Sequence, residues 1–356
     1  MSDRAEQAFR DAFAEQARVP LGRVAPKPPH RPHRAWAVAA AVAAVALAIP
    51  LAVVLGTRPV QVATPAVPAT VSGLPAPEEG WRWVSRGDVA VQVPDEWGWS
   101  DYAWTPWCLG ETPEPQPPAT PFVSTPAGPV AAIACPEWQP EWVQTYLDFA
   151  DPAAEPPSLT PVLSRTVGTT DVRVVLRADA TAADEAVAQG ILDSATVFER
   201  DAAGCAPVAP FADLEARPEA WDVTGAEGVV EVGLCRYLDY ALEADRPNLT
   251  ASRVLGGEDA GALIAAVAAA PEGVSGNPAD CLSDYDQRSG LVLRVLDATG
   301  VHDVYLRVDG CRNLGFDDGT TRRELTRDGC TPVFAAPPLR FDGGQPEAVS
   351  ACFAGE

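Results

Sequence analysis

The chain has 356 residues, with 26 Lys and Arg against 49 Asp and Glu, which gives a formal net charge of −23 at pH 7. A surface this acidic disfavours nucleic acid and anionic lipid headgroups, since both bind to basic patches. Of the three histidines only His302 lies beyond residue 33, so a His-rich metal site is excluded in the long C-terminal part.

Residues 35–56 form an uncharged apolar run, flanked by Arg34 and Arg58. A bilayer core of ~30 Å needs about 20 apolar residues in a helix, so we expect one transmembrane helix that crosses the lipid bilayer from Ala35 to Gly56. The leading segment has more cationic than acidic residues, which predicts a cytoplasmic N-terminus and an extracytoplasmic C-terminal part. The alternative is a cleaved signal peptide, but its leading and apolar regions are usually shorter.

Residues 57–80 are rich in Pro, Ala, Val and Thr without any periodicity, and they predict an extended tether. Two further proline-dense stretches, 111–129 and 152–161, predict long surface loops. The remaining chain is too long for one typical core, so we expect two domains, over 81–200 and 201–356.

The first domain begins with residues that alternate between apolar and polar. This pattern predicts strands over 81–83, 89–93 and 170–177. Residues 181–197 have apolar side chains at helical spacing, with Thr181 as the N-cap and Asp184 in the position of a capping box. Helices and strands mixed in this way predict an α+β fold.

The second domain continues the same mixture. Strands are predicted over 229–234, 291–296 and 302–308, the last two joined in a hairpin at Gly300. Residues 258–270 predict a helix that Pro271 ends. Thirteen residues cannot span a bilayer, so this helix is expected to belong to the core.

All the cysteines follow the apolar run: Cys108, Cys135, Cys205, Cys235, Cys281, Cys311, Cys330 and Cys352. Their even number in an exported part predicts disulfides formed in an oxidising compartment. No C-x-x-C spacing occurs, which argues against a zinc ribbon and against a thioredoxin-like redox motif.

A shift of 76 residues superposes one pair of cysteines on another with the same spacing of 30. The shift also matches Arg236 with Arg312 and Leu249 with Leu325. Self-similarity at a fixed period predicts an internal duplication, with copies near 205–254 and 281–330. If each copy closes its own loop and the other cysteines pair by neighbourhood, the disulfides are Cys205–Cys235, Cys281–Cys311, Cys108–Cys135 and Cys330–Cys352.

Four tryptophans crowd one short stretch: Trp97, Trp99, Trp104 and Trp107. As an exposed aromatic patch they would suit stacking on sugar rings or on a partner protein. The alternative is that they fill a core that is otherwise short of large apolar residues.

Other candidates are weaker. His302 is the one exported histidine, but no nucleophile motif accompanies it, which favours a structural role in a strand. Asp317 and Asp318 lie in an acidic sequence that is typical of a turn and lacks the spacing of a calcium loop. Asn248 begins a sequence that matches a glycosylation acceptor. We therefore expect no cofactor, no metal and no enzymatic activity.

The cytoplasmic head of residues 1–34 places Ala5, Phe9, Phe13 and Ala17 along one helical face. An amphipathic helix ahead of one span resembles the layout of bacterial membrane-bound anti-sigma factors, although the His-x3-Cys-x2-Cys motif of that family is missing. Over its full length, the layout and composition resemble single-pass, disulfide-bearing exported proteins of unknown function from actinobacteria. That resemblance implies no catalytic residues.

The sequence therefore predicts a membrane-anchored extracytoplasmic protein that binds a cell-surface protein or glycan, or has a structural role at the cell surface. Two alternatives remain open. One is a membrane-bound regulator that acts through the head. The other is a cell-wall hydrolase that uses dispersed carboxylates, of which no pair is distinguished by its spacing.

Overall fold

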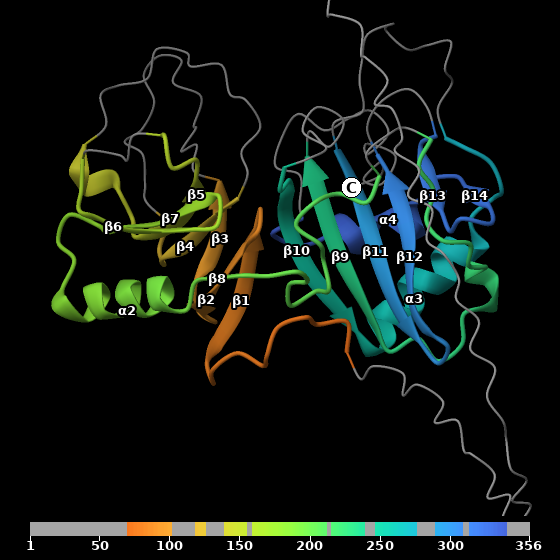
Figure 1. Ribbon diagram of the computed structural model, residues 1–356, viewed down its shortest axis with the longest axis horizontal. Coiled ribbons are helices and arrows are strands. Elements are labelled where there is room, and N and C mark those ends of the chain that lie inside the picture. Colours follow the sequence, from red (N-terminus) through yellow and green to blue (C-terminus); the bar gives the residue numbers. More distant parts are fainter. Residues whose placement is uncertain are drawn as a thin grey trace, which may run out of the picture. The chain divides into compact units, whose positions relative to one another are not determined.

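The computed structural model describes residues 70–101, 118–125, 139–154, 159–211, 215–238, 246–275, 289–308 and 313–339. These residues form three β-sheets with associated helices, which confirms the predicted mixture of α and β structure (Figure 1). The predicted span 35–56 lies outside them. Within the described residues, no helix is both long enough and apolar enough to cross a membrane.

The first sheet is three-stranded, in the order β1-β2-β8. It contains β1 (Trp81–Arg86), β2 (Val89–Pro94) and the short β8 (Thr196–Val197), all antiparallel. The alternating pattern predicted β1 and β2. β2 is buried on both faces: Val89, Val91 and Val93 join one core, whereas Ala90 joins another.

The second sheet is five-stranded, in the order β3-β4-β5-β7-β6. Its strands are β3 (Gly98–Asp101), β4 (Phe122–Thr125), β5 (Tyr146–Ala150), β6 (Val162–Val167) and β7 (Thr170–Val175). β3, β4 and β5 are parallel, and the pairings of β7 are antiparallel. The prediction of a continuous loop over 111–129 is wrong at β4, because four residues between prolines carry too short a pattern to be recognised.

Helix α2 (Ala182–Asp193) begins at the predicted N-cap, and the capping box between Thr181 and Asp184 is present. Its buried face of Ala188, Ile191 and Leu192 packs into the core shared by β2, β5 and β7. The helix ends four residues earlier than predicted, because the chain turns at Ser194 and then pairs with β2 as β8.

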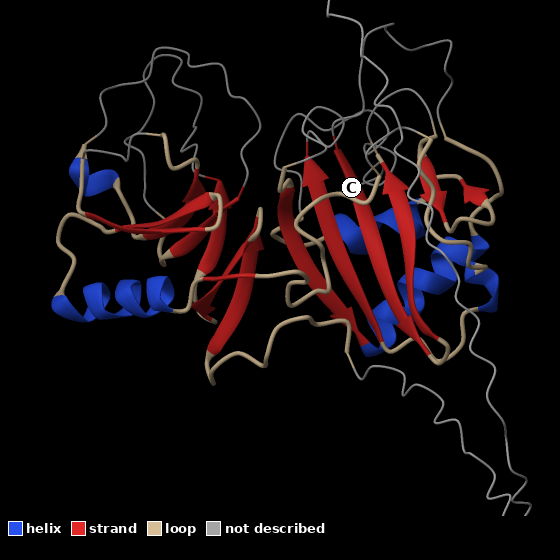
Figure 2. Cartoon of the chain, viewed as in Figure 1, coloured by secondary structure: helices blue, strands red, loops and turns tan. Residues whose placement is uncertain are grey.

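The third sheet is six-stranded, in the order β10-β9-β11-β12-β13-β14. Its strands are β9 (Glu231–Leu238), β10 (Leu249–Gly256), β11 (Ser289–Asp297), β12 (Gly300–Arg307), β13 (Gly315–Asp317) and β14 (Arg322–Arg323). Helices α3 (Gly257–Ala269) and α4 (Arg327–Phe334) cover one face of this sheet (Figures 1 and 2). The hairpin at Gly300 and the helix before Pro271 are confirmed. Two short 3₁₀ helices, η1 (Pro140–Trp142) and η2 (Val223–Gly225), complete the described elements.

The predicted duplication is not reflected in these elements. A shift of 76 residues places Leu249, which begins strand β10, on Leu325, and Thr250 on Thr326, which is the N-cap of helix α4. A strand and a helix therefore occupy matched positions. Although some of the identities are adjacent in the sequence, the spacing of apolar residues between them differs, so the two segments fold differently where both are described.

The C-terminal part of the predicted tether is bound to the six-stranded sheet. The carboxylate of Glu231 accepts hydrogen bonds from Thr70 Oγ1 at 3.0 Å and from the backbone N–H of Val71 at 3.1 Å. The side chain of Val71 is 6% exposed, and the N–H of Gly73 donates to the carbonyl of Asp201 at 2.8 Å. The tether predicted over 57–80 is therefore not free along its whole length, because its apolar Val71 is buried in this domain.

Candidate functional site

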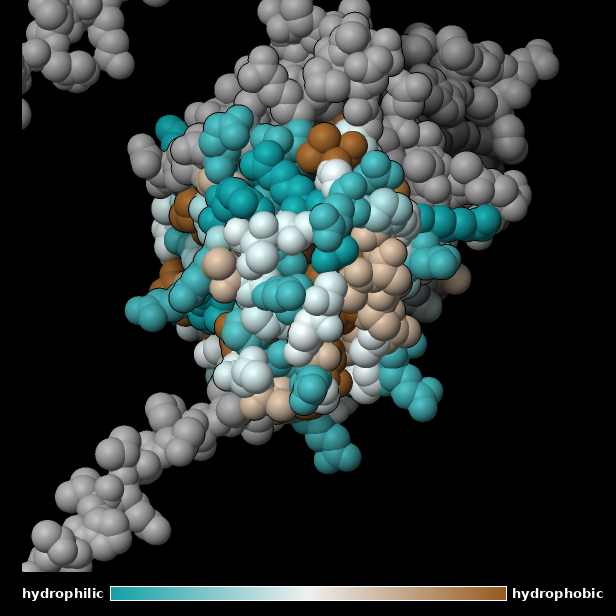
Figure 3. Space-filling model, turned by 90° about the vertical axis from the view of Figure 1, so that its right-hand side faces the viewer, coloured by the Kyte–Doolittle hydropathy of each residue, from teal (hydrophilic) through white to brown (hydrophobic). Residues whose placement is uncertain are grey.

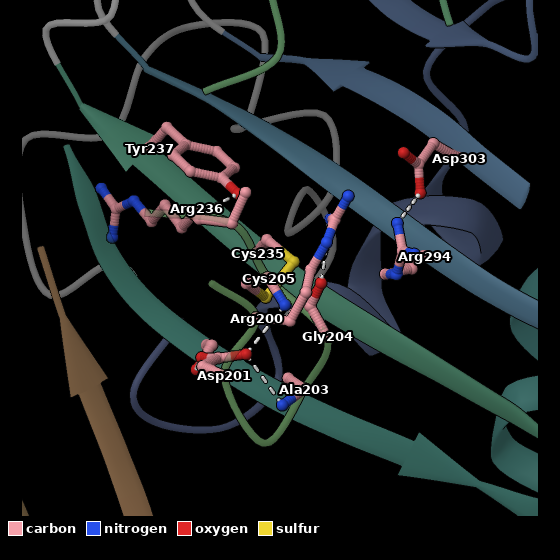
Figure 4. The surroundings of a disulfide bond; sticks show 12 residues. Arg200, Asp201, Ala203, Gly204, Cys205, Cys235, Arg236, Tyr237, Arg294 and Asp303 are labelled. Atoms are coloured by element: carbon pink, nitrogen blue, oxygen red, sulfur yellow. Dashed lines mark hydrogen bonds and ion pairs between the residues drawn. A yellow bond between two sulfur atoms is a disulfide. The ribbon is translucent and has the colours of Figure 1, made fainter. Parts of the chain in front are cut away.

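The Cys205–Cys235 disulfide lies on the face of the six-stranded sheet opposite α3 and α4 (Figure 4). This pairing confirms the prediction made from spacing, and both cysteines are 1% exposed. Cys330 is disulfide-bonded as well, to a partner outside the described residues. The five other cysteines, Cys108, Cys135, Cys281, Cys311 and Cys352, also lie outside them.

Asp201 organises the backbone beside this disulfide, as Figure 4 shows. One oxygen of its fully buried carboxyl group accepts the backbone N–H groups of Ala203 at 2.9 Å and Cys205 at 2.8 Å. The other oxygen accepts the hydroxyl of Ser252 at 2.5 Å. Burial raises the pKa of Asp201, although hydrogen bonds from Ser252, Cys205, Ala203 and Ser85 act in the opposite direction. The group thus connects the turn at 201–205 with β1 and β10.

From this turn the chain runs across the same face of the sheet as a crossing segment, which we define as residues 201–211 and 215–221. The hydroxyl of Tyr237 donates to the carbonyl of Ala206 at 2.9 Å, and Arg307 Nη2 donates to the carbonyl of Ala216 at 2.5 Å. Phe211 holds the middle of the crossing segment on the sheet. Its ring packs edge-on against the rings of Tyr237 and Tyr305, with centroids 5.9 Å and 5.0 Å apart. Burial raises the pKa of Tyr305 to about 12, which keeps its hydroxyl protonated.

The possible glycosylation acceptor Asn248 is part of this arrangement. It is 7% exposed, and its side-chain oxygen accepts the N–H of Ala209 at 2.9 Å. A buried side chain that holds the crossing segment is not available to a glycan on the folded protein, so the match to the acceptor sequence has a structural explanation.

His302 lies at the tip of the β11–β12 hairpin, where its ring stacks on that of Trp221 with centroids 4.6 Å apart. Its Nε2 is 2.8 Å from Thr299 Oγ1 and 3.4 Å from the buried carboxylate of Asp297. In a catalytic triad the acid and the nucleophile contact opposite nitrogens of the histidine ring. Here Asp297 and Thr299 both lie near the same nitrogen, Nε2. The geometry therefore fits a structural role, in which these side chains hold the hairpin turn. Asp297 also accepts hydrogen bonds from the backbone N–H groups of Thr299 and Gly300.

The acidic sequence at the end of β13 is a turn, as predicted. The carboxylate of Asp317 accepts hydrogen bonds from Arg217 Nη2 at 2.7 Å and from Arg217 Nε at 3.0 Å, and it also forms an ion pair with Arg322. Asp318 accepts backbone N–H groups, including that of Val223 at 3.1 Å. Both carboxylates are thus engaged in the fold, and no group of three or more His, Cys, Asp or Glu among the described residues is placed to hold a metal ion.

Two of the four predicted patch tryptophans are described. Trp97 is 6% exposed and belongs to the core of the first two sheets, and Trp99 packs against that core. Arg82 lies 5.4 Å over the ring of Trp99. Trp104 and Trp107 lie outside the described residues, so the predicted patch is tested only in part, and this part supports the alternative of a core.

The described surface carries few apolar side chains. The large hydrophobic residues exposed among the described parts are scattered singly: Leu159, Val197, Val230, Val254 and Val274. Figure 3, drawn from the side where β13 and β14 lie in Figure 1, is mostly hydrophilic with small separate hydrophobic spots. Sequence reasoning missed Arg307 and Trp221, whose partners Ala216 and His302 lie far away in the chain. It also missed Asp201, whose bonds to Ala203 and Cys205 are local but whose bond to Ser252 is not.

A scan against protein-family models, a search of curated proteins and a search of solved structures each find no match to this chain. The described residues form a six-stranded sheet, one face of which is covered by the crossing segment. A disulfide and hydrogen bonds hold that segment on the sheet.

Proposed function

We propose that the chain is a single-pass membrane protein whose exported part acts at the cell surface by binding a protein or a glycan. The observation that carries the proposal is the buried Cys205–Cys235 disulfide, which follows the apolar run 35–56 in the chain. Disulfides persist in oxidising compartments outside the cytoplasm. An uncharged run of this length supports retention in the membrane. The segment before it has more cationic than acidic residues and ends at Arg34, which supports a cytoplasmic N-terminus.

Three of the described carboxylates have structural roles in the fold. Asp201, Asp297 and Asp317 each accept two or more hydrogen bonds from groups that hold a turn. A pair of carboxylates for glycoside hydrolysis must instead face a shared substrate space with one acid and one base or nucleophile.

Protease added to intact cells tests the topology. We expect it to remove nearly everything after Arg58, while a cytoplasmic control protein stays intact. Permeabilised cells provide the second control, because there the head should be degraded as well. Full protection of the C-terminal part, on cells whose other surface proteins are cut, would contradict the proposal.

Incubation of the full chain in detergent with peptidoglycan and with model glycosides separates binding from hydrolysis. Co-sedimentation with peptidoglycan without released sugar would support a glycan-binding role. Turnover that disappears on one Asp or Glu substitution would replace that role with the hydrolase alternative.

A further inference from the structure

The chain leaves the six-stranded domain and returns to it at the same place. The N–H of Gly73 donates to the carbonyl of Asp201 at 2.8 Å, so residues 74–200 begin and end at one hydrogen bond. These residues contain the first two sheets and α2. They form a lobe inserted between residue 73, on the side of the predicted membrane anchor, and residue 201.

The contacts on the anchor side of this point are made with β9. Thr70 and Val71 donate to both oxygens of the Glu231 carboxylate, at distances from 3.0 to 3.3 Å. Val71 is buried, and Gly204 makes room for its approach. A Cβ on Gly204 would lie 2.5 Å from the carbonyl oxygen of Val71.

The turn beside these contacts is itself bonded to two strands of the sheet. Asp201 accepts the hydroxyl of Ser252 in β10, and Cys205 is bonded to Cys235 in β9 (Figure 4). Both strands lie side by side in the six-stranded sheet. A pull on residue 70 from the N-terminal side is therefore resisted by β9 and β10 before it reaches β1.

We propose that residues 70–73, together with Asp201 and Glu231, form a clamp that transmits tension from the tether into the disulfide-stapled sheet and bypasses the lobe of residues 74–200. The clamp matters in the cell only if the chain is anchored, so its role rests on the proposed function. Its mechanics do not, because they depend only on contacts within the exported part.

Optical tweezers on the full chain in detergent test the clamp, with one handle on each terminus. Release of the lobe is recognised by its length: with the predicted Cys108–Cys135 disulfide closed, about 100 of residues 74–200 extend, by about 35 nm at roughly 3.5 Å a residue. In the wild-type chain we expect this step only with or after the unfolding of the six-stranded sheet. In Glu231→Ala we expect the step to come first, at a lower force.

The matched control is Glu227→Ala, an exposed glutamate shortly before β9 whose removal should leave the order of steps unchanged. Thr70→Val is a milder variant that removes one donor without opening the fold, and it should lower the force of the lobe step less than Glu231→Ala does. A wild-type chain that releases the lobe first would overturn the inference, as would the same order of steps in wild type and Glu231→Ala. Neither result would affect the protease test of the anchor.

Discussion

Asp201 shows how one carboxyl group fixes a turn, and its burial gives a first prediction. Asp201→Asn keeps an oxygen for Ala203 and Cys205 and removes the buried charge, so the free energy of unfolding at neutral pH should fall by less than about 1 kcal/mol. Asp201→Ala leaves two buried N–H donors without an acceptor and should cost about 3 kcal/mol or more. Urea unfolding measures both variants, and equal losses would contradict this account.

The pH dependence of Asp201 has a definite sign. Because burial raises the pKa of this carboxyl group, the folded state binds its proton more readily than the unfolded state does. The contribution to stability is complete below the ordinary pKa of an aspartate and is lost as the pH rises through the raised value. In Asp201→Asn this part of the pH dependence should disappear.

Asp317 gives a second prediction, with the opposite sign. Burial disfavours its charge, but hydrogen bonds from Arg217, Gly319 and Arg322 prevail and lower the pKa of Asp317. The stabilisation is present above the ordinary pKa and is lost as the pH falls through the lowered one. Arg217→Met should therefore destabilise the fold near neutral pH, with a difference in the free energy of unfolding that narrows once the pH falls below the ordinary aspartate pKa of about 4.

A matched control for Arg217 is Arg177→Met, which breaks the exposed pair between Arg177 and Asp179. Exposed pairs contribute little, so this variant should follow the wild-type unfolding curve. A constant difference between Arg217→Met and wild type at every pH would show that the arginine acts through packing alone.

At the scale of elements, β9 depends on a close approach that only glycine allows. A Cβ on Gly233 would lie 1.9 Å from the carbonyl oxygen of Ala203, so Gly233→Ala should push the turn off the strand and cost about 2 kcal/mol or more. Gly261 in α3 has open space around it, and Gly261→Ala should stabilise by about 0.5–1 kcal/mol. Thermal unfolding of both variants decides; a loss in each would contradict the prediction.

The elements that could be predicted are those with a long period or a clear end. β1, β2, β7, α3 and the β11–β12 hairpin follow from alternation or from a proline stop, and the start of α2 from its capping box. Of the strands that were missed, β4 and β13 have four and three residues, too few to show an alternation. The eight-residue β10 was missed as well, because its burial follows from its pairing with β9. Helix α4 contains Pro332 and depends on its Thr326 cap and on burial of Phe334.

At the scale of the molecule, the disulfide spans a separation of 30 residues and joins the crossing segment to the sheet. The chain-entropy account gives about 3–4 kcal/mol for a loop of that length. Replacing Cys205 and Cys235 together by Ser should lower the free energy of unfolding by about that amount, measured by urea unfolding without reductant. No change would show that the hydrogen bonds around Asp201 hold the segment alone.

The site could be predicted only where spacing or residue type carries the signal. Equal spacing identified the Cys205–Cys235 pair, and residue type identified the turn at Asp317. The roles of Arg307 and Asn248 depend on what the crossing segment brings over them, and no pattern within a window of sequence contains that information. Asp201 lies in that segment, and its bond to Ser252 in β10 depends on the fold in the same way. Burial is a property of the whole fold, and these residues acquire their partners from it.

The bond between residues 73 and 201 also orders events in time. During synthesis from the N-terminus, Thr70 appears long before Glu231, its partner 161 positions later. The lobe between them has local contacts and can condense early, whereas the hydrogen bonds of Thr70 and Val71 cannot form until β9 has emerged. The contacts of Thr70 and Val71 are therefore among the last to form, and a chain stalled before β9 would hold a condensed lobe whose N-terminal side is still unbound.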